Sequence, residues 1–112
     1  MPRIQNIFSI LSSVKSILQS QFKVKSLWAF GSLVRNELTP SSDIDILVDF
    51  QESASLFDLV ALGDFLQEKL HRPVDVVSLR ALRPELKDQV FKEMVVIWPR
   101  IIAFILRIFL KP

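Results

Sequence analysis

Two aspartates separated by one residue are the most suggestive chemical feature of this sequence. Asp43 and Asp45 stand in SSDIDILVDF, a segment that is rich in β-forming residues and alternates in part. On a strand, side chains two residues apart project from the same face, with backbones about 7 Å apart. Mg²⁺ is commonly held by one or two carboxylates together with substrate phosphates. The pair suits a site for a metal and a nucleotide, although an isolated DxD more often marks only a polar turn.

A glycine and a serine upstream add a second feature. Gly31-Ser32 follow a strand-like run that ends at Phe30. Glycine lets the backbone turn sharply and approach a phosphate closely, and the Ser32 hydroxyl can donate a hydrogen bond to its oxygens. Further along, Asp75 interrupts the apolar run PVDVVSL. Singly, the Gly-Ser pair indicates only a turn and Asp75 only a polar interruption in a strand.

The elements that must position these residues follow from the hydrophobic periodicity. Helices are predicted at 4–18, 56–70 and 84–94, and strands at 24–30, 43–50 and 74–79, with a short segment around 95–98 after the last helix. Ser55 and Asp58 have the spacing of a capping box, and Pro84 suits the first turn of a helix. This order predicts one α/β (α+β) domain over residues 1–98, with a small mixed β-sheet and helices packed on it.

Composition narrows the chemistry. The 112 residues suffice for one domain with a modest core. With no cysteine and a single histidine, His71, the chain lacks thiolate zinc sites, cysteine nucleophiles and histidine clusters for metals. A net charge of +2, from 14 basic and 12 acidic side chains, is too balanced to indicate a nucleic-acid coat. We expect a cytoplasmic location, His71 and Arg72 facing solvent, and Trp28 in the core or an interface.

The C-terminal residues 99–112 form an apolar tail. Its central run, IIAFILRIFL at 101–110, is broken only by Arg107. A membrane span needs roughly 20 apolar residues, so we expect no insertion into a membrane. An exposed run of this kind promotes association, and we expect a partner protein or a second copy of the chain to cover it.

The combined spacing resembles a known family. Gly31-Ser32, ten intervening residues and Asp43-Ile44-Asp45 match the GSx10DxD signature of nucleotidyltransferases of the DNA polymerase β superfamily. The short chain looks like the minimal nucleotidyltransferase (MNT) branch, and the resemblance runs from about residue 27 to residue 97. It implies a polymerase β-like fold and a Mg²⁺-dependent enzyme that uses ATP as its nucleotide.

The same resemblance assigns roles to individual residues. It implies that Asp43 and Asp45 are the catalytic metal ligands, and that Asp75 completes an acidic cluster for two Mg²⁺ ions. It also implies that Gly31 and Ser32 hold the triphosphate. Arg35 stands at a position that is often basic in the family, and would contact phosphate.

A biological role comes with the family. MNT proteins commonly occur beside a HEPN-type RNase in toxin–antitoxin modules, so the resemblance implies an antitoxin that transfers AMP from ATP to a tyrosine of the toxin, in a hetero-oligomer with it. Two alternatives stay open. The chain could neutralise its partner by binding alone, with a vestigial nucleotide site, or transfer a nucleotide to RNA or to a small molecule such as an aminoglycoside. The lack of a basic patch argues against stable nucleic-acid binding.

Overall fold

The computed structural model describes residues 4–31, 34, 35, 37, 39 and 42–98. Its elements are α1 (Ile4–Ser13), α2 (Lys15–Gln21), β1 (Val24–Phe30), β2 (Ile44–Phe50), α3 (Leu56–Leu70), β3 (Val74–Ser78), the 3₁₀ helix η2 (Leu79–Ala81), α4 (Pro84–Glu93) and β4 (Val95–Trp98). Ser32 and the apolar tail 99–112 lie outside the described residues, so the expectations for them stay predictions.

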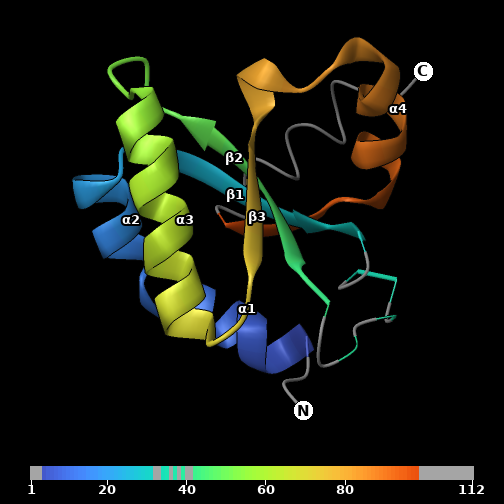
Figure 1. The fold of residues 1–112 in the computed structure, drawn as a ribbon, viewed down its shortest axis with the longest axis horizontal. Coiled ribbons are helices and arrows are strands. Elements are labelled where there is room, and N and C mark those ends of the chain that lie inside the picture. The colour runs from blue at the N-terminus through green and yellow to red at the C-terminus, as the bar shows by residue number, and fades with distance from the viewer. Residues whose placement is uncertain (1–3, 32–33, 36, 38, 40–41, 99–112) are drawn as a thin grey trace.

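The strands of the described chain form one mixed sheet in the order β3-β2-β1-β4. β1 pairs antiparallel with β2 and with β4, whereas β2 pairs parallel with β3. A parallel pair needs a crossover connection, and α3 supplies it (Figure 1). The predicted fold class, a small mixed sheet with helices packed on it, is confirmed, and the short segment around 95–98 is a paired strand.

Helices cover the two faces of this sheet unequally. Figure 1 shows α1, α2 and α3 together on one side and α4 on the other. The larger core fills the side of the three helices and includes Leu11, Leu18, Ile46, Leu62 and Leu66, all of them fully buried. The smaller core, on the α4 side, consists of Trp28, Leu47, Leu82 and Val90. Polar groups on the α4 face therefore have an open route to solvent beside a single short helix.

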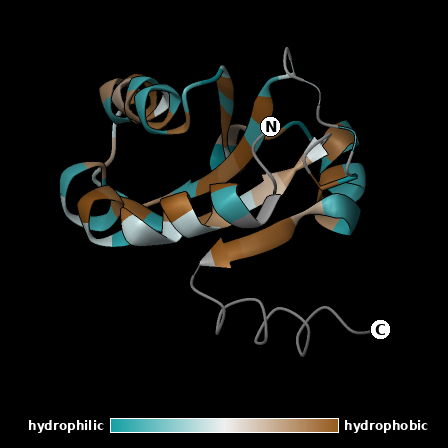
Figure 2. Ribbon diagram, turned by 90° about the horizontal axis from the view of Figure 1, so that it is seen from below, coloured by the Kyte–Doolittle hydropathy of each residue, from teal (hydrophilic) through white to brown (hydrophobic). Residues whose placement is uncertain are grey.

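The central strand β2 is apolar toward both sides. Ile46 faces the larger core and Leu47 the smaller one, and both are fully buried. Hydropathy colouring shows the strands as mostly hydrophobic ribbons, whereas the helices alternate (Figure 2), as expected for elements with one solvated face. The buried Trp28 confirms its predicted place in the core.

The predicted helix over 4–18 is two helices. The chain bends at Val14, whose backbone has φ −100° and ψ 10°, between α1 and α2. Just before the bend, the Ser13 hydroxyl donates to the carbonyl oxygen of Ile10 at 2.6 Å. A serine hydroxyl that competes for a helical carbonyl in this way favours bending. Apolar periodicity does not register such a bend, because both helices keep their apolar stripes on the sheet.

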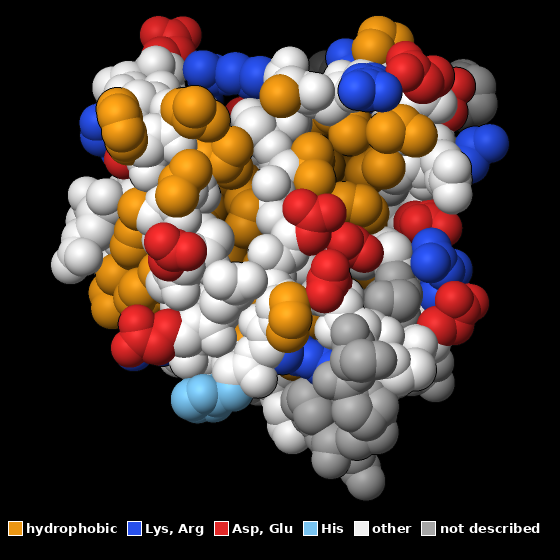
Figure 3. All heavy atoms as spheres, viewed as in Figure 1, with side chains coloured by type: hydrophobic (Ala, Val, Ile, Leu, Met, Phe, Trp, Pro, Cys, Tyr) orange, Lys and Arg blue, Asp and Glu red, His pale blue; other side chains and the backbone are white. Residues whose placement is uncertain are grey.

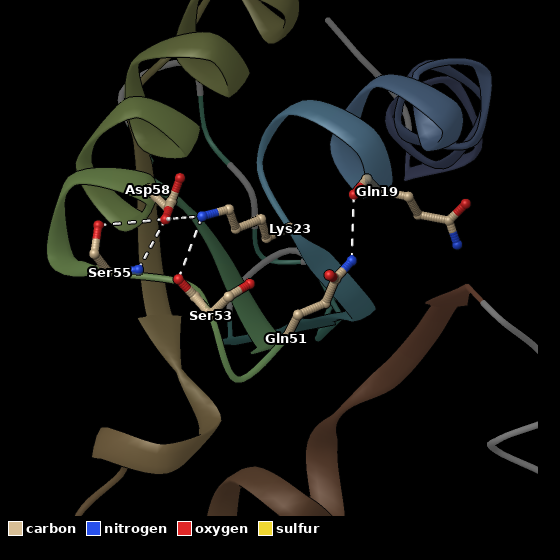
Figure 4. A network of polar contacts seen from close by, with 6 residues as sticks. All are labelled: Gln19, Lys23, Gln51, Ser53, Ser55 and Asp58. Carbon is tan, nitrogen blue, oxygen red and sulfur yellow. Dashed lines mark hydrogen bonds and ion pairs between the residues drawn. The ribbon is translucent and has the colours of Figure 1, made fainter.

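A polar network joins the start of α3 to the turn before β1 (Figure 4). The Ser55 backbone N–H donates to Oδ2 of Asp58 at 2.8 Å, the bond that a capping box predicts. Lys23 Nζ lies 3.8 Å from the same carboxylate oxygen and donates to the carbonyl oxygen of Ser53 at 3.3 Å. These contacts fix the end of α3 that is remote from the entry to β3. No helix in the described part of the chain is long and apolar enough to cross a membrane.

Candidate active site

The turn after β1 is built around Gly31. Its backbone φ of +72° lies in the left-handed region, which favours glycine. The Gly31 carbonyl oxygen accepts hydrogen bonds from the backbone N–H groups of Val34 and Arg35, each at 3.1 Å. Space is short as well, because an added Cβ would overlap Oδ2 of Asp45 and lie 3.0 Å from its Cγ. Backbone conformation and packing against Asp45 both require glycine here.

The pairing of β2 with β3 places Asp45 beside Asp75. The two residues are partners in the parallel register, on strands that lie about 4.8 Å apart. Leu47 and Val77, two residues further along each strand, belong to the α4-side core, so both aspartates face that side. Asp43 is exposed and immediately precedes β2, which begins one residue later than predicted. Figure 3 shows acidic side chains gathered over this part of the sheet, between apolar areas.

The neighbouring carboxylates affect the ionisation of Asp45. The pKa of Asp45 rises from its ordinary value of 3.8 to about 6. Burial of the side chain is the main cause, and the negative charges of Asp75 and Asp43 add to it; Arg35 opposes the rise and Glu93 reinforces it. Like charges disfavour ionisation when no cation compensates them. The site is therefore a half-buried acid flanked by two exposed ones.

The donor set suits Mg²⁺ bound together with a nucleotide. Across the described ranges, no group of three or more His, Asp or Glu side chains is arranged to hold a metal ion by itself. Mg²⁺ does not need such a cage, since one or two carboxylates with phosphate oxygens and waters complete its coordination. A divalent cation would also relieve the repulsion that, together with burial, raises the pKa of Asp45. Asp43 and Asp45 fit that role, with Asp75 adjacent.

Arg35 closes one edge of the site. Its Nη1 donates to Oε1 of Glu93, the last residue of α4, at 2.8 Å, and its Nε donates to Oε2 of Glu37 at 3.3 Å. These carboxylates raise the pKa of the guanidinium above its ordinary value. Two acids therefore hold the Arg35 guanidinium at this edge, and its contact with phosphate stays a prediction.

The comparison with known families decides the assignment. Residues 12–101 match the family described as "Polymerase beta, Nucleotidyltransferase", which is most of the chain. The chain belongs to this nucleotidyltransferase family. Among its relatives, the protein adenylyltransferase MntA of Thermococcus cleftensis is 38% identical over 92 residues, which cover 82% of this chain and 93% of that protein.

Solved structures agree with the assignment. A minimal nucleotidyltransferase structure matches with a TM-score of 0.74 and 32% identity, over 84% of this chain and 95% of that one. A chain from the complex of a tri-AMPylated Shewanella oneidensis HEPN toxin with MNT antitoxin matches with a TM-score of 0.64, over 85% of this chain and 71% of that one. Its identity of 23% shows the fold alone. The predicted polymerase β-like fold and the nucleotidyltransferase class are confirmed.

The nucleotidyltransferase also contains a buried arginine, Arg72, which the sequence analysis expected to face solvent. Arg72 is only 9% exposed. Its Nη2 donates to the backbone carbonyl oxygen of Thr39, in the connection between β1 and β2, while Nη1 is buried without an acceptor among the described residues. The expectation of a solvent-facing Arg72 was wrong, because the side chain is buried and its guanidinium is held against the Thr39 carbonyl oxygen. His71 is exposed as expected and ends α3 in a left-handed conformation.

The sequence predicted most of this site and missed one residue of it, Glu93. Gly31, Asp45 and Asp75 come together as the resemblance implied, with Asp43 at the strand entrance. Glu93 was missed, since the position of α4 over the sheet cannot be read from periodicity. The burial of Arg72, which lies outside this site, was also missed, because an arginine in a loop gives no signal of burial.

Proposed function

We propose that this nucleotidyltransferase is the antitoxin of a toxin–antitoxin pair, and that it silences a HEPN-type RNase toxin by transferring AMP from Mg²⁺-ATP to a tyrosine hydroxyl. The observation that carries the proposal is the register of Asp45 with Asp75 beside the Gly31 turn. That juxtaposition sets carboxylates for a metal against a backbone turn suited to phosphate. The protein acceptor is supported by the name of the Thermococcus cleftensis relative and by the AMPylated HEPN toxin in the complex described above.

The reaction assigns a task to each side chain. The phenol oxygen of the acceptor attacks the α-phosphorus of ATP, the bond from that phosphorus to the bridging oxygen breaks, and pyrophosphate leaves. Asp75, exposed and next to Asp45, is placed to accept the phenol proton. Asp43 and Asp45 would hold Mg²⁺, which neutralises charge on the phosphates. Arg35 and the Gly31 turn bind the triphosphate.

The consequence for the toxin is electrostatic. An AMP group on a tyrosine adds a bulky anion to the toxin surface. Near the site where an RNase binds the phosphates of RNA, this anion repels the substrate and blocks it sterically. Neutralisation by modification therefore outlasts dissociation of the two proteins, whereas neutralisation by binding does not.

Intact-mass spectrometry of the toxin tests the proposal. A HEPN-type toxin from the same genome is co-expressed with the wild-type chain or with the Asp43→Asn/Asp45→Asn variant, then separated and weighed. We expect toxin heavier by one or more AMP units with the wild type, and unmodified toxin with the variant, whose fold is checked by circular dichroism.

Two other outcomes would redirect the assignment. A toxin that is silenced yet unmodified in both samples would refute AMP transfer and leave an antitoxin that acts by binding. A toxin that stays active and unmodified with a folded wild-type chain would remove the antitoxin role, and labelled ATP with RNA or small-molecule acceptors would then identify the transfer reaction.

A further inference from the structure

One ion pair connects the glycine turn to the far end of α4. Arg35 Nη1 lies 2.8 Å from Oε1 of Glu93, across 58 residues of chain. Its Nε also donates to Glu37, at 3.3 Å, but that carboxylate is the more exposed of the two partners, 61% against 24%. Glu93 is therefore the firmer partner, and it stands on a helix rather than in the connection that carries Arg35.

The pair belongs to the edge of the acidic site. Both of its charges act on Asp45, since Arg35 lowers the pKa of that carboxyl and Glu93 raises it. The Arg35 backbone N–H also donates to the Gly31 carbonyl oxygen at 3.1 Å, so the arginine directly follows the turn against which Asp45 packs. A substrate phosphate seated at the Gly31 turn would lie within reach of the guanidinium.

Among the described residues, one nitrogen of the Arg35 guanidinium is without a hydrogen-bond acceptor. Nε and Nη1 hold carboxylates, whereas Nη2 makes none of the hydrogen bonds found in the described part of the chain. The fork of an arginine is planar and rigid, so fixing two of its nitrogens fixes the direction of the third. A free arginine on a surface turn would instead lose side-chain entropy on gripping a phosphate.

We propose that Glu93 is a positioning residue for nucleotide binding, which acts through Arg35 by holding its guanidinium toward the triphosphate. This inference rests on the proposed function, because it assumes that the Gly31 turn receives a nucleotide. The opposite effect is also physically available: Glu93 carries a negative charge near the phosphates and would weaken binding if it acted by itself. The sign of its effect therefore separates positioning from simple repulsion.

A double-mutant cycle with a fluorescent ATP analogue and Mg²⁺ tests the inference. Equilibrium titrations compare wild type, Glu93→Gln, Arg35→Ala and the double variant, with Asp88→Asn as the control, an exposed carboxylate on the same helix. We expect Glu93→Gln to weaken binding by about fivefold. In the Arg35→Ala background the same change should have almost no effect, because Glu93 has nothing left to position. Asp88→Asn should bind like wild type.

Three results would overturn the inference while leaving the proposed function intact. These are unchanged binding by Glu93→Gln, tighter binding by Glu93→Gln, and an equal loss with or without Arg35. A merely structural role for Glu93 would lower the melting temperature and weaken binding in both backgrounds alike. A wild-type chain that does not bind the analogue would instead refute the proposed function, and the inference with it.

Discussion

Replacement by alanine should have opposite effects on stability at the two glycines of the chain, Gly31 and Gly63. Gly31 has φ +72°, and an added Cβ would overlap the Asp45 carboxylate. A left-handed alanine costs about 1–2 kcal/mol and overpacking about 1–3 kcal/mol more. Gly63 lies within α3, and there a Cβ would meet only Cγ2 of Val76, at an ordinary 3.9 Å. Alanine in the interior of a helix is more stable than glycine by about 0.5–1 kcal/mol.

Thermal and urea unfolding of the metal-free protein, followed by circular dichroism, measures both effects. Gly31→Ala should lower the free energy of unfolding by about 2–5 kcal/mol and the melting temperature by roughly 10 °C or more. Gly63→Ala should raise the melting temperature by a few degrees. Adding Asp45→Ala to Gly31→Ala removes the overlap but not the backbone strain, so it should recover only part of the loss.

Equal stability of the two alanine variants would refute this reasoning about Gly31. The loss in free energy of unfolding caused by Gly31→Ala could also stay the same in the Asp45→Ala background. That result would refute only the proposed overlap with the Asp45 carboxylate, and leave the left-handed backbone as the cause.

Two further predictions concern charges in and near the site. Because the pKa of Asp45 is about 6 in the fold against 3.8 ordinarily, the native state binds the proton more tightly, and stability should fall as pH rises from about 4 to above 6. Asp45→Asn should remove this dependence and stabilise the metal-free fold at pH 7.5 by about 1–2 kcal/mol, a value discounted for the partial exposure of the side chain. Urea unfolding at a series of pH values checks this prediction. An unchanged slope of the free energy of unfolding against pH in the variant would contradict it. Arg72→Ala should lower the free energy of unfolding by about 1–3 kcal/mol, and Arg72→Lys should not restore it, since a lysine has no planar fork to reach Thr39. A lysine variant as stable as wild type in thermal unfolding would show that charge or chain length alone suffices.

The sequence predicted the positions of the elements because each carries its own periodicity. The strands β1, β2 and β3 and the helix α3 fall within a residue of the expected bounds, and Pro84 begins α4 as its ring requires. The bend at Val14 was not predicted, since a side-chain bond from Ser13 decides it. Local patterns therefore set the elements, and single polar contacts modify them.

The site was predictable to the extent that it is local. Asp43, Asp45 and the Gly31 turn lie close together in the sequence, and their spacing indicates a metal and a phosphate. The place of Asp75 came from family resemblance rather than from spacing, because only the β2–β3 register brings it to Asp45. The contact of Glu93 at the end of α4 depends on packing that no short-range pattern encodes, and so does that of Arg72 in the turn before β3.

The parallel pairing of β2 with β3 also determines when the acidic cluster forms during folding. Asp45 and Asp75 are separated in the chain by all of α3, and they become neighbours only when β3 docks. Such long-range closure comes late, after local helices and hairpins have formed. Their mutual repulsion is absent from the unfolded chain, and under the proposed function a nucleotide at this site would recognise only the completed sheet. Substrate should therefore slow the unfolding of this protein far more than it speeds its folding, and prolong the lifetime of the native state.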